Sequence, residues 1–257
     1  MSIAPGWAPS RSLRRLVGRS RDEVETDRAV VVIHDVTKTY PNGRHALREV
    51  DLVIPEGDFV FLVGPSGAGK STLIRLLIRD ELPTSGEVVF DGQDVARLSR
   101  RQVPKLRRKI GVVFQDFKLL QTKTVRENVA FALEVTGTPR RQIRPAVDRV
   151  LALVGLTAQA DQVPAQLSGG EQQRTAIARA LVHSPRVIIA DEPTGNLDQL
   201  ISWEILQLLL RINEMGVTVL MATHNAEFVT ALRRRVVALE EGRVVRDEVG
   251  GAYHGPD

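Results

Sequence analysis

Residues 64–71 read Gly-Pro-Ser-Gly-Ala-Gly-Lys-Ser and come directly after Phe59–Val63, a continuous apolar run. A run of this kind is typical of a strand buried on both faces of a parallel sheet. The stretch fits the phosphate-binding pattern G-x-x-x-x-G-K-[ST], whose glycines let backbone N–H groups converge on phosphate oxygens. Ser71–Arg79 is expected to form a helix that points its positive end at the same anion. The sequence therefore predicts a nucleotide-binding loop at the carboxyl end of a buried strand.

Side chains at the ends of two predicted strands carry the expected phosphate and magnesium chemistry. Lys70 is expected to hold the β- and γ-phosphates of ATP, and the Ser71 hydroxyl to bind Mg²⁺. Val187–Ala190 predicts a second buried strand, which ends in Asp191 and Glu192. Since ligands bind at the carboxyl ends of parallel strands, we expect Asp191 to hold Mg²⁺ through water. Glu192 is expected to orient or deprotonate the attacking water, although the pair alone could be a solvated acidic turn.

Three further positions each have a functional and an ordinary interpretation. Gln115 follows the strand-like run Ile110–Phe114, so its amide could contact Mg²⁺ or the attacking water, or it could be an ordinary loop residue. His224 follows the predicted strand Val217–Ala222, where a ring N–H could reach the γ-phosphate, or it could be a capping or surface histidine. Tyr40 could stack on adenine or be a half-buried strand tyrosine.

Leu167–Arg174 reads Leu-Ser-Gly-Gly-Glu-Gln-Gln-Arg and predicts a second phosphate site. Ser168 and Gly169-Gly170 offer a hydroxyl and bare backbone N–H groups at the start of a helix expected over Glu171–His183. One chain then has two phosphate sites for one nucleotide. We therefore expect a head-to-tail homodimer in which each copy completes the other's site.

Strand and helix signals alternate along the rest of the chain, which favours a mostly parallel sheet covered on both faces. Residues 100–170 are expected to be mostly helical, with a capping box from Thr124 to Glu127 opening Val125–Glu134. The other expected elements are strands at Val30–Ile33 and Ala46–Ile54, helices at Ala146–Val154 and Ile201–Asn213, and a terminal hairpin of Val236–Leu239 and Arg243–Arg246.

The composition excludes several classes of protein. With 257 residues, the chain suits one domain or one domain with a subdomain. It has no cysteine, which excludes disulfides and thiolate metal sites and fits a reducing compartment. The sequence contains no run of 18 apolar residues, so no segment is expected to span a bilayer. We also expect no signal peptide. The net charge of +4 fits nucleic acid, an anionic membrane surface, or simply arginine-rich solubility.

Residues 1–28 differ in composition from the rest of the chain. They contain Arg11, Arg14, Arg15, Arg19 and Arg21 and no acid before Asp22. We interpret them as a basic arm that either lies on anionic headgroups or is a flexible extension.

The motifs together, in this order, resemble ABC-type ATPase domains over residues of about 30–248. The resemblance implies an α/β fold: a RecA-like P-loop NTPase core with an antiparallel β subdomain and an α-helical signature subdomain. It divides the chain into the arm 1–28, an ATPase domain over 29–248 with its helical subdomain at about 100–170, and a tail over 249–257.

The same resemblance implies roles for individual residues, with ATP and Mg²⁺ as cofactors. The expected catalytic residues are Glu192, His224 and Gln115. The expected metal ligands are Ser71, Gln115 and Asp191. Nucleotide contacts fall to Tyr40, Gly64, Pro65, Ser66, Gly67, Ala68, Gly69, Lys70, Ser71, Thr72, Ser168, Gly169, Gly170 and Asp198, the last at the dimer interface. Asn225 stands where the family usually has Asp, and Gln199 where Pro is common; neither change removes a catalytic group.

A narrower resemblance is to the FtsE group of bacterial cell-division ATPases. It is carried by Phe114–Leu120, Lys123–Val125 and Glu127–Leu133, and the stretches Val103–Arg107 and Gly242–Glu248 resemble actinobacterial members of the group. It implies an integral membrane partner (FtsX-like), an indirect link to peptidoglycan hydrolases during septation, and a peripheral place on the cytoplasmic face of the plasma membrane at the division site.

Two alternatives and one docking hypothesis remain at this point. An exporter or lipoprotein-releasing ATPase would share the same core. A nucleic-acid ATPase is not expected, because the chain has neither the long coiled coil of repair forms nor the second cassette of translation forms. For the membrane partner, we expect docking on Phe117–Val125, with Phe117, Leu119 and Leu120 exposed in a loop, unless these side chains pack inside the helical subdomain.

Overall fold

The computed structural model describes residues 28–251. The predicted basic arm therefore lies outside the described residues except for Arg28, and the tail is described only as far as Gly251. Within this range the longest helix has 16 residues, and no helix there has the length and apolar character needed to cross a bilayer.

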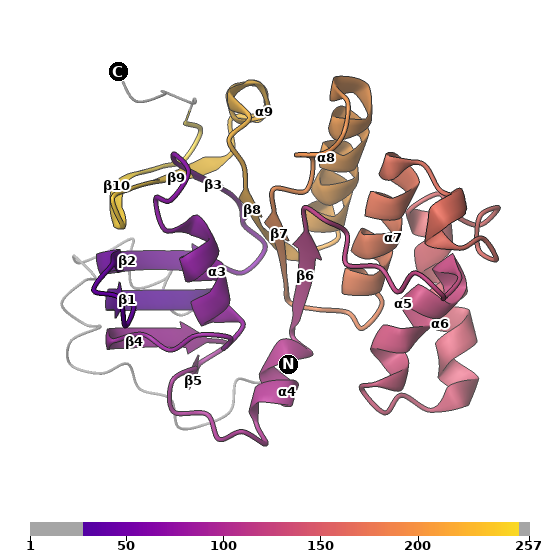
Figure 1. The fold of residues 1–257 in the computed structure, drawn as a ribbon, viewed down its shortest axis with the longest axis horizontal. Coiled ribbons are helices and arrows are strands. Elements are labelled where there is room, and N and C mark those ends of the chain that lie inside the picture. Colours follow the sequence, from indigo (N-terminus) through magenta and orange to yellow (C-terminus); the bar gives the residue numbers. More distant parts are fainter. Residues whose placement is uncertain (1–27, 252–257) are drawn as a thin grey trace.

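The central element is a six-stranded sheet with the order β10-β9-β3-β8-β7-β6 (Figure 1). Strands β9, β3, β8, β7 and β6 run parallel to one another, and only β10 is antiparallel to its neighbour. The strands are β3 (Phe59–Val63), β6 (Ile110–Phe114), β7 (Val187–Asp191), β8 (Thr218–Ala222), β9 (Arg235–Glu240) and β10 (Arg243–Glu248). The predicted terminal hairpin is therefore confirmed as β9 and β10.

A second sheet of four strands is antiparallel throughout and has the order β2-β1-β4-β5. Its strands are β1 (Ala29–Thr39), β2 (His45–Pro55), β4 (Ser85–Phe90) and β5 (Gln93–Asp94). The helices are α3 (Lys70–Leu77), α4 (Val103–Arg107), α5 (Val125–Glu134), α6 (Arg140–Leu153), α7 (Gly169–Leu181), α8 (Gln199–Glu214) and α9 (Ala226–Leu232), with a 3₁₀ turn η1 (Pro164–Gln166).

The two faces of the central sheet bury different halves of the molecule. Along β3, Phe59, Phe61 and Val63 join the core that contains α5 to α9, whereas Val60 and Leu62 join the core that contains α3 and the antiparallel sheet. This alternation follows from the two-residue period of a strand. Helices α3 and α7 lie on opposite sides of the sheet (Figure 1). Because both faces are covered, β3 is apolar at every position.

The helical content of residues 100–170 is lower than predicted. The capping box is confirmed: Thr124 Oγ1 accepts from Glu127 N at 3.2 Å, and Glu127 Oε2 accepts from Thr124 N at 2.8 Å. Residues 115–124 and 154–163, however, are irregular. The first segment needs no helix because the buried side chain of Asn128 satisfies several of its backbone groups.

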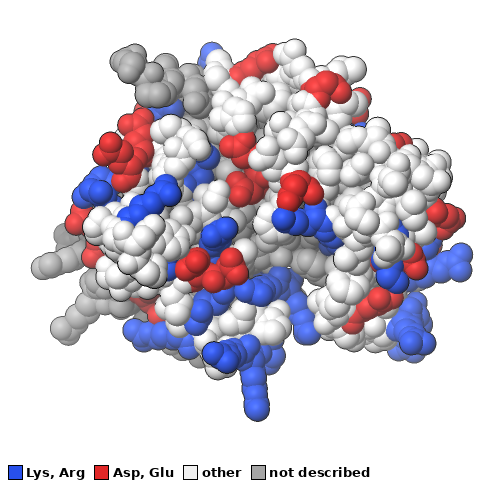
Figure 2. All heavy atoms as spheres, in the orientation of Figure 1, with Lys and Arg blue, Asp and Glu red and all other residues white. Residues whose placement is uncertain are grey.

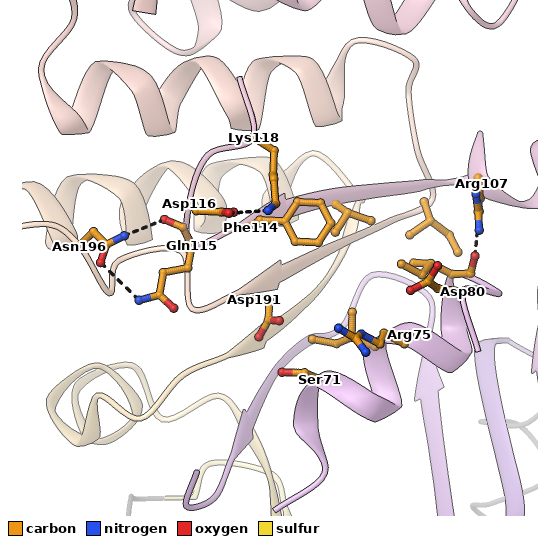
Figure 3. A pocket seen from close by; sticks show the side chains of 14 residues that line it. Ser71, Arg75, Asp80, Arg107, Phe114, Gln115, Asp116, Lys118, Asp191 and Asn196 are labelled. Atoms are coloured by element: carbon orange, nitrogen blue, oxygen red, sulfur yellow. Dashed lines mark hydrogen bonds and ion pairs between the residues drawn. The ribbon is translucent and has the colours of Figure 1, made fainter. Parts of the chain in front are cut away.

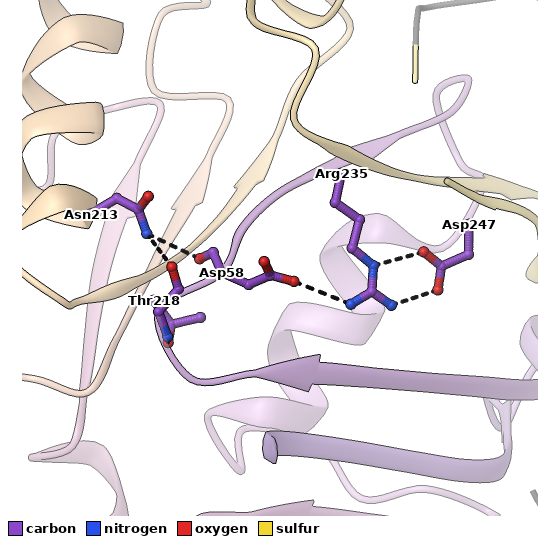
Figure 4. Close-up of polar contacts among 6 residues, drawn as sticks. Asp58, Asn213, Thr218, Arg235 and Asp247 are labelled. Atoms are coloured by element: carbon purple, nitrogen blue, oxygen red, sulfur yellow. Dashed lines mark hydrogen bonds and ion pairs between the residues drawn. The ribbon is translucent and has the colours of Figure 1, made fainter. Parts of the chain in front are cut away.

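A polar cluster fixes the terminal hairpin to the start of β3 (Figure 4). Arg235 donates to both carboxylate oxygens of Asp247 at 2.7 Å and to Asp58 at 3.2 Å. Burial by itself would lower the pKa of Arg235, but its bonds to the two carboxylates outweigh that and raise the pKa. Asn213 of α8 donates to Gly57 O at 2.8 Å. Side chains from the hairpin and from α8 therefore both bind the residues that precede β3.

Candidate functional site

The phosphate-binding loop is shaped by glycines that pack against other strands. Gly64 has φ = 142°, and a Cβ there would lie 2.1 Å from the carbonyl oxygen of Leu239 in β9. Gly69 has φ = 114°, and a Cβ there would lie 2.6 Å from Ala46 O in β2. The buried Lys70 donates to Gly64 O at 2.6 Å and to the next carbonyl at 3.1 Å. Only glycine fits these two positions, and the loop is held in shape from both sheets.

A cavity of about 590 Å³ opens over this loop. It brings together most of the predicted site residues, which come from β1, α3 and the ends of β6, β7 and β8. The lining comprises Tyr40, Arg44, Gly64, Pro65, Ser66, Gly67, Gly69, Lys70, Ser71, Thr72, Arg75, Gln115, Asp191, Glu192 and His224. Ala68 does not line it, because its side chain is buried beneath the loop.

Asp191 and Ser71 point toward each other from β7 and α3 (Figure 3). Burial, followed by the neighbouring charge of Glu192, raises the pKa of Asp191, while a hydrogen bond from Ser71 acts in the opposite direction. The charge of Glu192 next to Asp191 favours a bound cation that neutralises these carboxylates and the phosphates. Carboxylate, hydroxyl and amide oxygens suit Mg²⁺, so Asp191, Ser71 and Gln115 fit this ion.

Glu192 holds a backbone conformation that its residue type disfavours. Its φ is 50°, and its N–H donates to Ala222 O of the adjacent strand β8 at 3.0 Å. One carboxylate oxygen lies 2.5 Å from Nδ1 of His224. The left-handed conformation costs about 1–2 kcal/mol, so the neighbouring strand is needed to keep the carboxylate in place.

Gln115 is tied to the loop that follows β7 (Figure 3). Its side chain donates to Asn196 Oδ1 at 3.4 Å, and Asn196 Nδ2 returns a bond to Gln115 O at 3.2 Å. A Cβ at Gly195 would lie 2.7 Å from the Gln115 amide nitrogen. The close approach of this loop therefore fixes Gln115 beside the cavity.

Tyr40 contacts the helix that follows the phosphate loop. Its hydroxyl lies 3.4 Å from Thr72 Oγ1, and Lys38 Nζ lies 5.0 Å from the centre of its ring. The ring is half-buried at the wall of the cavity, where one face has a cation as neighbour.

The second predicted phosphate site lies elsewhere. Ser168 caps α7: its Oγ accepts from Glu171 N at 3.3 Å, and Glu171 bonds back to Ser168 N at 2.8 Å. The backbone and hydroxyl bonds from Ser168 lower the pKa of Glu171. Neither Ser168, Gly169, Gly170 nor Asp198 lines the cavity over the phosphate loop. This separation is what the homodimer prediction requires.

The two departures from the family pattern have local roles. Asn225 caps α9 by accepting from Glu227 N at 3.0 Å and Phe228 N at 3.3 Å, so an amide replaces the usual carboxylate as cap. Asp198 caps α8 by accepting from Ile201 N, and Gln199 donates to Glu227 at 2.9 Å.

The cavity also contains side chains that the sequence did not single out. Arg44 and Arg75 line it, and Arg44 donates to Gly67 O at 3.4 Å. Arg75 could have been found, since it lies four residues after Ser71 on the same helix face. Arg44 and Asn196 had no local signal, because tertiary contacts alone bring them to the site.

The predicted exposure of the docking loop is wrong for Leu119 and Phe117, whereas Leu120 is half-exposed. Leu119 is only 7% exposed and belongs to the core of the α5–α8 side, and Phe117 packs against the same core. Residues 117–125 therefore present mainly polar groups to solvent, and the alternative interpretation, packing inside the helical subdomain, applies.

Comparisons with known proteins identify the family of this chain. Residues 47–195 match the family described as ABC transporter. The Cell division ATP-binding protein FtsE of Streptococcus pneumoniae is 54% identical over 225 residues, which cover 88% of this chain and 98% of that protein. FtsE of Mycobacterium tuberculosis is 55% identical over 225 residues, covering 87% of this chain and 98% of that protein.

Solved structures support the same fold. CbiO1 from Clostridium perfringens, part of the ABC transporter complex cbiONQ, has a TM-score of 0.81 at 34% identity and covers 87% of this chain and 89% of its own. The dimeric bacterial ABC transporter cassette MJ0796 has a TM-score of 0.77 at 39% identity, covering 87% of this chain and all of its own. The chain therefore belongs to the ABC transporter family, within its FtsE group of cell-division ATP-binding proteins.

Proposed function

We propose that this chain is the ATP-hydrolysing subunit of a membrane complex that acts in cell division, and that two copies close head to tail around Mg²⁺-ATP. The observation that carries this is the cavity that joins the phosphate loop to Asp191, Glu192 and His224. The binding groups, metal-binding oxygens and an acid/base pair lie around one space of a size suited to a nucleotide.

Each group in the cavity has a proposed role. Lys70 leaves its two carbonyl partners and holds the β- and γ-phosphates, and Tyr40 stacks on the adenine. Ser71, Asp191 and Gln115 hold Mg²⁺, which neutralises phosphate charge when bound. Asp191 binds Mg²⁺ in its ionised form, and the bound cation offsets the burial and the neighbouring charge that raise its pKa.

Glu192 and His224 act together on the attacking water. The carboxylate accepts the water proton, and the His224 ring keeps the carboxylate aimed and contacts the γ-phosphate. The strained backbone of Glu192 supports this role, because such strain persists where the surrounding structure holds a side chain in place for function.

A second copy supplies the remaining contacts. The N-terminus of α7 at Ser168 lies outside the nucleotide cavity of its own chain, so it binds the nucleotide held by the other copy, with Asp198 at the interface. The dimeric form of the related cassette supports this arrangement. The nucleotide state is thereby converted into a distance between two copies.

The membrane partner, which is FtsX-like, docks in the outer part of a groove of about 830 Å³, whose inner end shares Ser71, Gln115 and Asp191 with the nucleotide cavity. The floor of the groove is apolar, with Ile74, Ile78 and Phe114, and charged side chains such as Arg107 and Asp116 stand on its rim (Figure 3). This pattern suits an amphipathic helix of the partner. The groove includes Lys118 but no other residue of the segment 117–125, so it takes the place of the predicted docking loop.

The charge distribution supports a place beside a membrane. Lys and Arg gather along the edge of the molecule that carries α4 (Figure 2). Arg100, Arg101, Lys105 and Arg108 are exposed there, and none pairs with an acidic side chain in residues 28–251. The proposed location is accordingly the cytoplasmic face of the plasma membrane at the division site, where the partner passes shape changes to peptidoglycan hydrolases.

The test is to purify the Glu192→Gln variant from native membranes with ATP and Mg²⁺, crosslink it, and identify its companions. The expected companion is a small polytopic protein with a large extracytoplasmic domain. A solute permease would instead indicate the alternative function, an exporter or lipoprotein-releasing ATPase. Nucleic acid or ribosomes among the companions would overturn the membrane assignment.

A further inference from the structure

The segment that joins β6 to α5, residues 115–124, is held in shape by side chains of other elements. At its far end, the fully buried Asn128 accepts from Leu120 N at 2.8 Å and donates to three carbonyl oxygens of the segment at 3.0–3.1 Å. At its near end, Asn196 donates to Gln115 O at 3.2 Å. The middle of the segment depends on a third contact.

That third contact comes from Arg179, which lies near the end of α7. Its Nη1 donates to Lys118 O at 2.7 Å, and its Nη2 donates to Phe117 O at 2.9 Å. The planar guanidinium thus holds two consecutive carbonyls in one fork, an arrangement that lysine cannot reproduce. Because Ser168 caps the other end of α7, one helix contacts both the segment and the second phosphate site.

The backbone at the contact needs an external support. Phe117 has φ = 56° and Lys118 has φ = 50°, so two successive residues with a Cβ lie in the left-handed region. Burial lowers the pKa of Arg179, and no acidic side chain of residues 28–251 pairs with it. A cation in such a place is compensated by carbonyl groups alone, which makes the two carbonyls its specific partners.

We propose that Arg179 is a positioning residue for ATP hydrolysis, which fixes Gln115 through the backbone of residues 117 and 118 and couples it to the helix that begins at Ser168. The inference rests on the proposed function. When Ser168 engages the nucleotide of a second copy, a displacement of α7 moves the carbonyls that Arg179 holds. Gln115, two residues before them, then moves relative to the phosphates in its own cavity.

Kinetics of the full chain test this coupling. Arg179→Met keeps an apolar stem of similar length, Arg179→Lys keeps the charge without the fork, and Arg211→Met on the exposed face of α8 is the matched control. We expect Arg179→Met to lower kcat roughly 10- to 100-fold, with KM for ATP within about twofold and a higher Mg²⁺ concentration at half-maximal rate. The kcat of Arg179→Lys should lie between those of Arg179→Met and the wild type, and the kcat of the control should match that of the wild type.

A double-variant cycle separates positioning from general structure. If Arg179 acts through Gln115, then Arg179→Met adds no further loss of kcat in a Gln115→Ala background. Losses that multiply independently, or an unchanged kcat in Arg179→Met, would overturn the inference.

Hydrogen exchange provides a readout that does not require turnover. In the nucleotide-free chain, Arg179→Met should raise amide exchange at residues 116–120 at least about tenfold while residues 171–178 stay protected. Unchanged protection at residues 116–120 would refute the proposal that Arg179 holds this backbone in place. Absence of hydrolysis in the wild type would refute the proposed function, and the exchange result would still decide whether Arg179 holds the loop.

Discussion

The imidazole Nδ1 of His224 lies 2.5 Å from a carboxylate oxygen of Glu192, and the two residues follow adjacent parallel strands. Strand pairing aligns Asp191 with Ala222, so the ends of β7 and β8 deliver both side chains to one point. The pair is therefore built by sheet register.

Replacing Glu192 with Gln should reduce ATP turnover about 10²- to 10⁴-fold, because the amide cannot accept the water proton. Binding of ATP should persist, since the phosphate loop is untouched, and the dimer should accumulate in the ATP-bound form. Steady-state phosphate release and sedimentation with ATP measure the two effects. Glu214→Gln, an exposed change on α8, is the matched control, and near-normal turnover in Glu192→Gln would remove this residue from the mechanism.

The His224–Glu192 contact predicts that the two residues act as a unit. His224→Ala should lower kcat about 10²-fold, and adding it to Glu192→Gln should cost little more, because the proton acceptor is already lost. Single-turnover hydrolysis of the three variants measures the coupling. Losses that multiply would show that His224 acts on phosphate independently of Glu192.

Asp191→Asn should separate stability from activity. The folded-state pKa of Asp191 lies above its ordinary value of 3.8. The protonated carboxyl therefore stabilises the fold below pH 3.8, and this stabilisation is lost as the pH rises through the raised pKa. Without nucleotide, the uncharged Asn variant should therefore unfold at a higher temperature than the wild type at neutral pH, and the difference should shrink toward pH 4. Thermal unfolding at several pH values tests this, while Mg²⁺-dependent turnover should fall at least about 10²-fold. A lower melting temperature for the variant at pH 7 would contradict the argument.

Arg235→Met should weaken the terminal hairpin. The change removes charge-assisted bonds to Asp247 and Asp58 and leaves the two carboxylates facing each other. We expect a loss of about 2–3 kcal/mol in the free energy of unfolding, or about 4–12 °C in melting temperature. Urea unfolding measures it against Arg234→Met, which is exposed and adjacent. Equal effects of the two changes would show that the cluster in Figure 4 adds no stability.

The parts of the fold that depend on local sequence could be predicted, and those that depend on distant contacts could not. Phe59–Val63 is the observed β3 because burial on both faces demands an unbroken apolar run. The strand Ser85–Phe90 has no comparable pattern, since its first half is exposed and its pairing with β1 and β5 makes it a strand. The core architecture therefore follows from motifs and apolar runs, whereas the antiparallel sheet came only from the family resemblance.

The candidate site shows the same division. Gln115, Glu192 and His224 could be named because each stands just after a predicted strand, where ligands meet a parallel sheet. The bond between Gln115 and Asn196 joins residues far apart in sequence, and no periodicity reports it. Leu119 was expected in solvent because its segment is a loop, yet irregular backbone can still turn one side chain into the core.

The phosphate loop depends for its shape on the last part of the chain. Strand β3 lies between β8 and β9, Gly64 packs against Leu239, and Gly242 N donates to Ala68 O at 3.0 Å. On the ribosome, β3 emerges long before these neighbours, so the loop can take its final shape only after the chain has been synthesised as far as Gly242. A chain that stalls before β9 lacks the strand that shapes its phosphate loop, so we expect it to bind ATP poorly. Nucleotide binding should therefore report that β8, β9 and the turn at Gly242 have folded around β3.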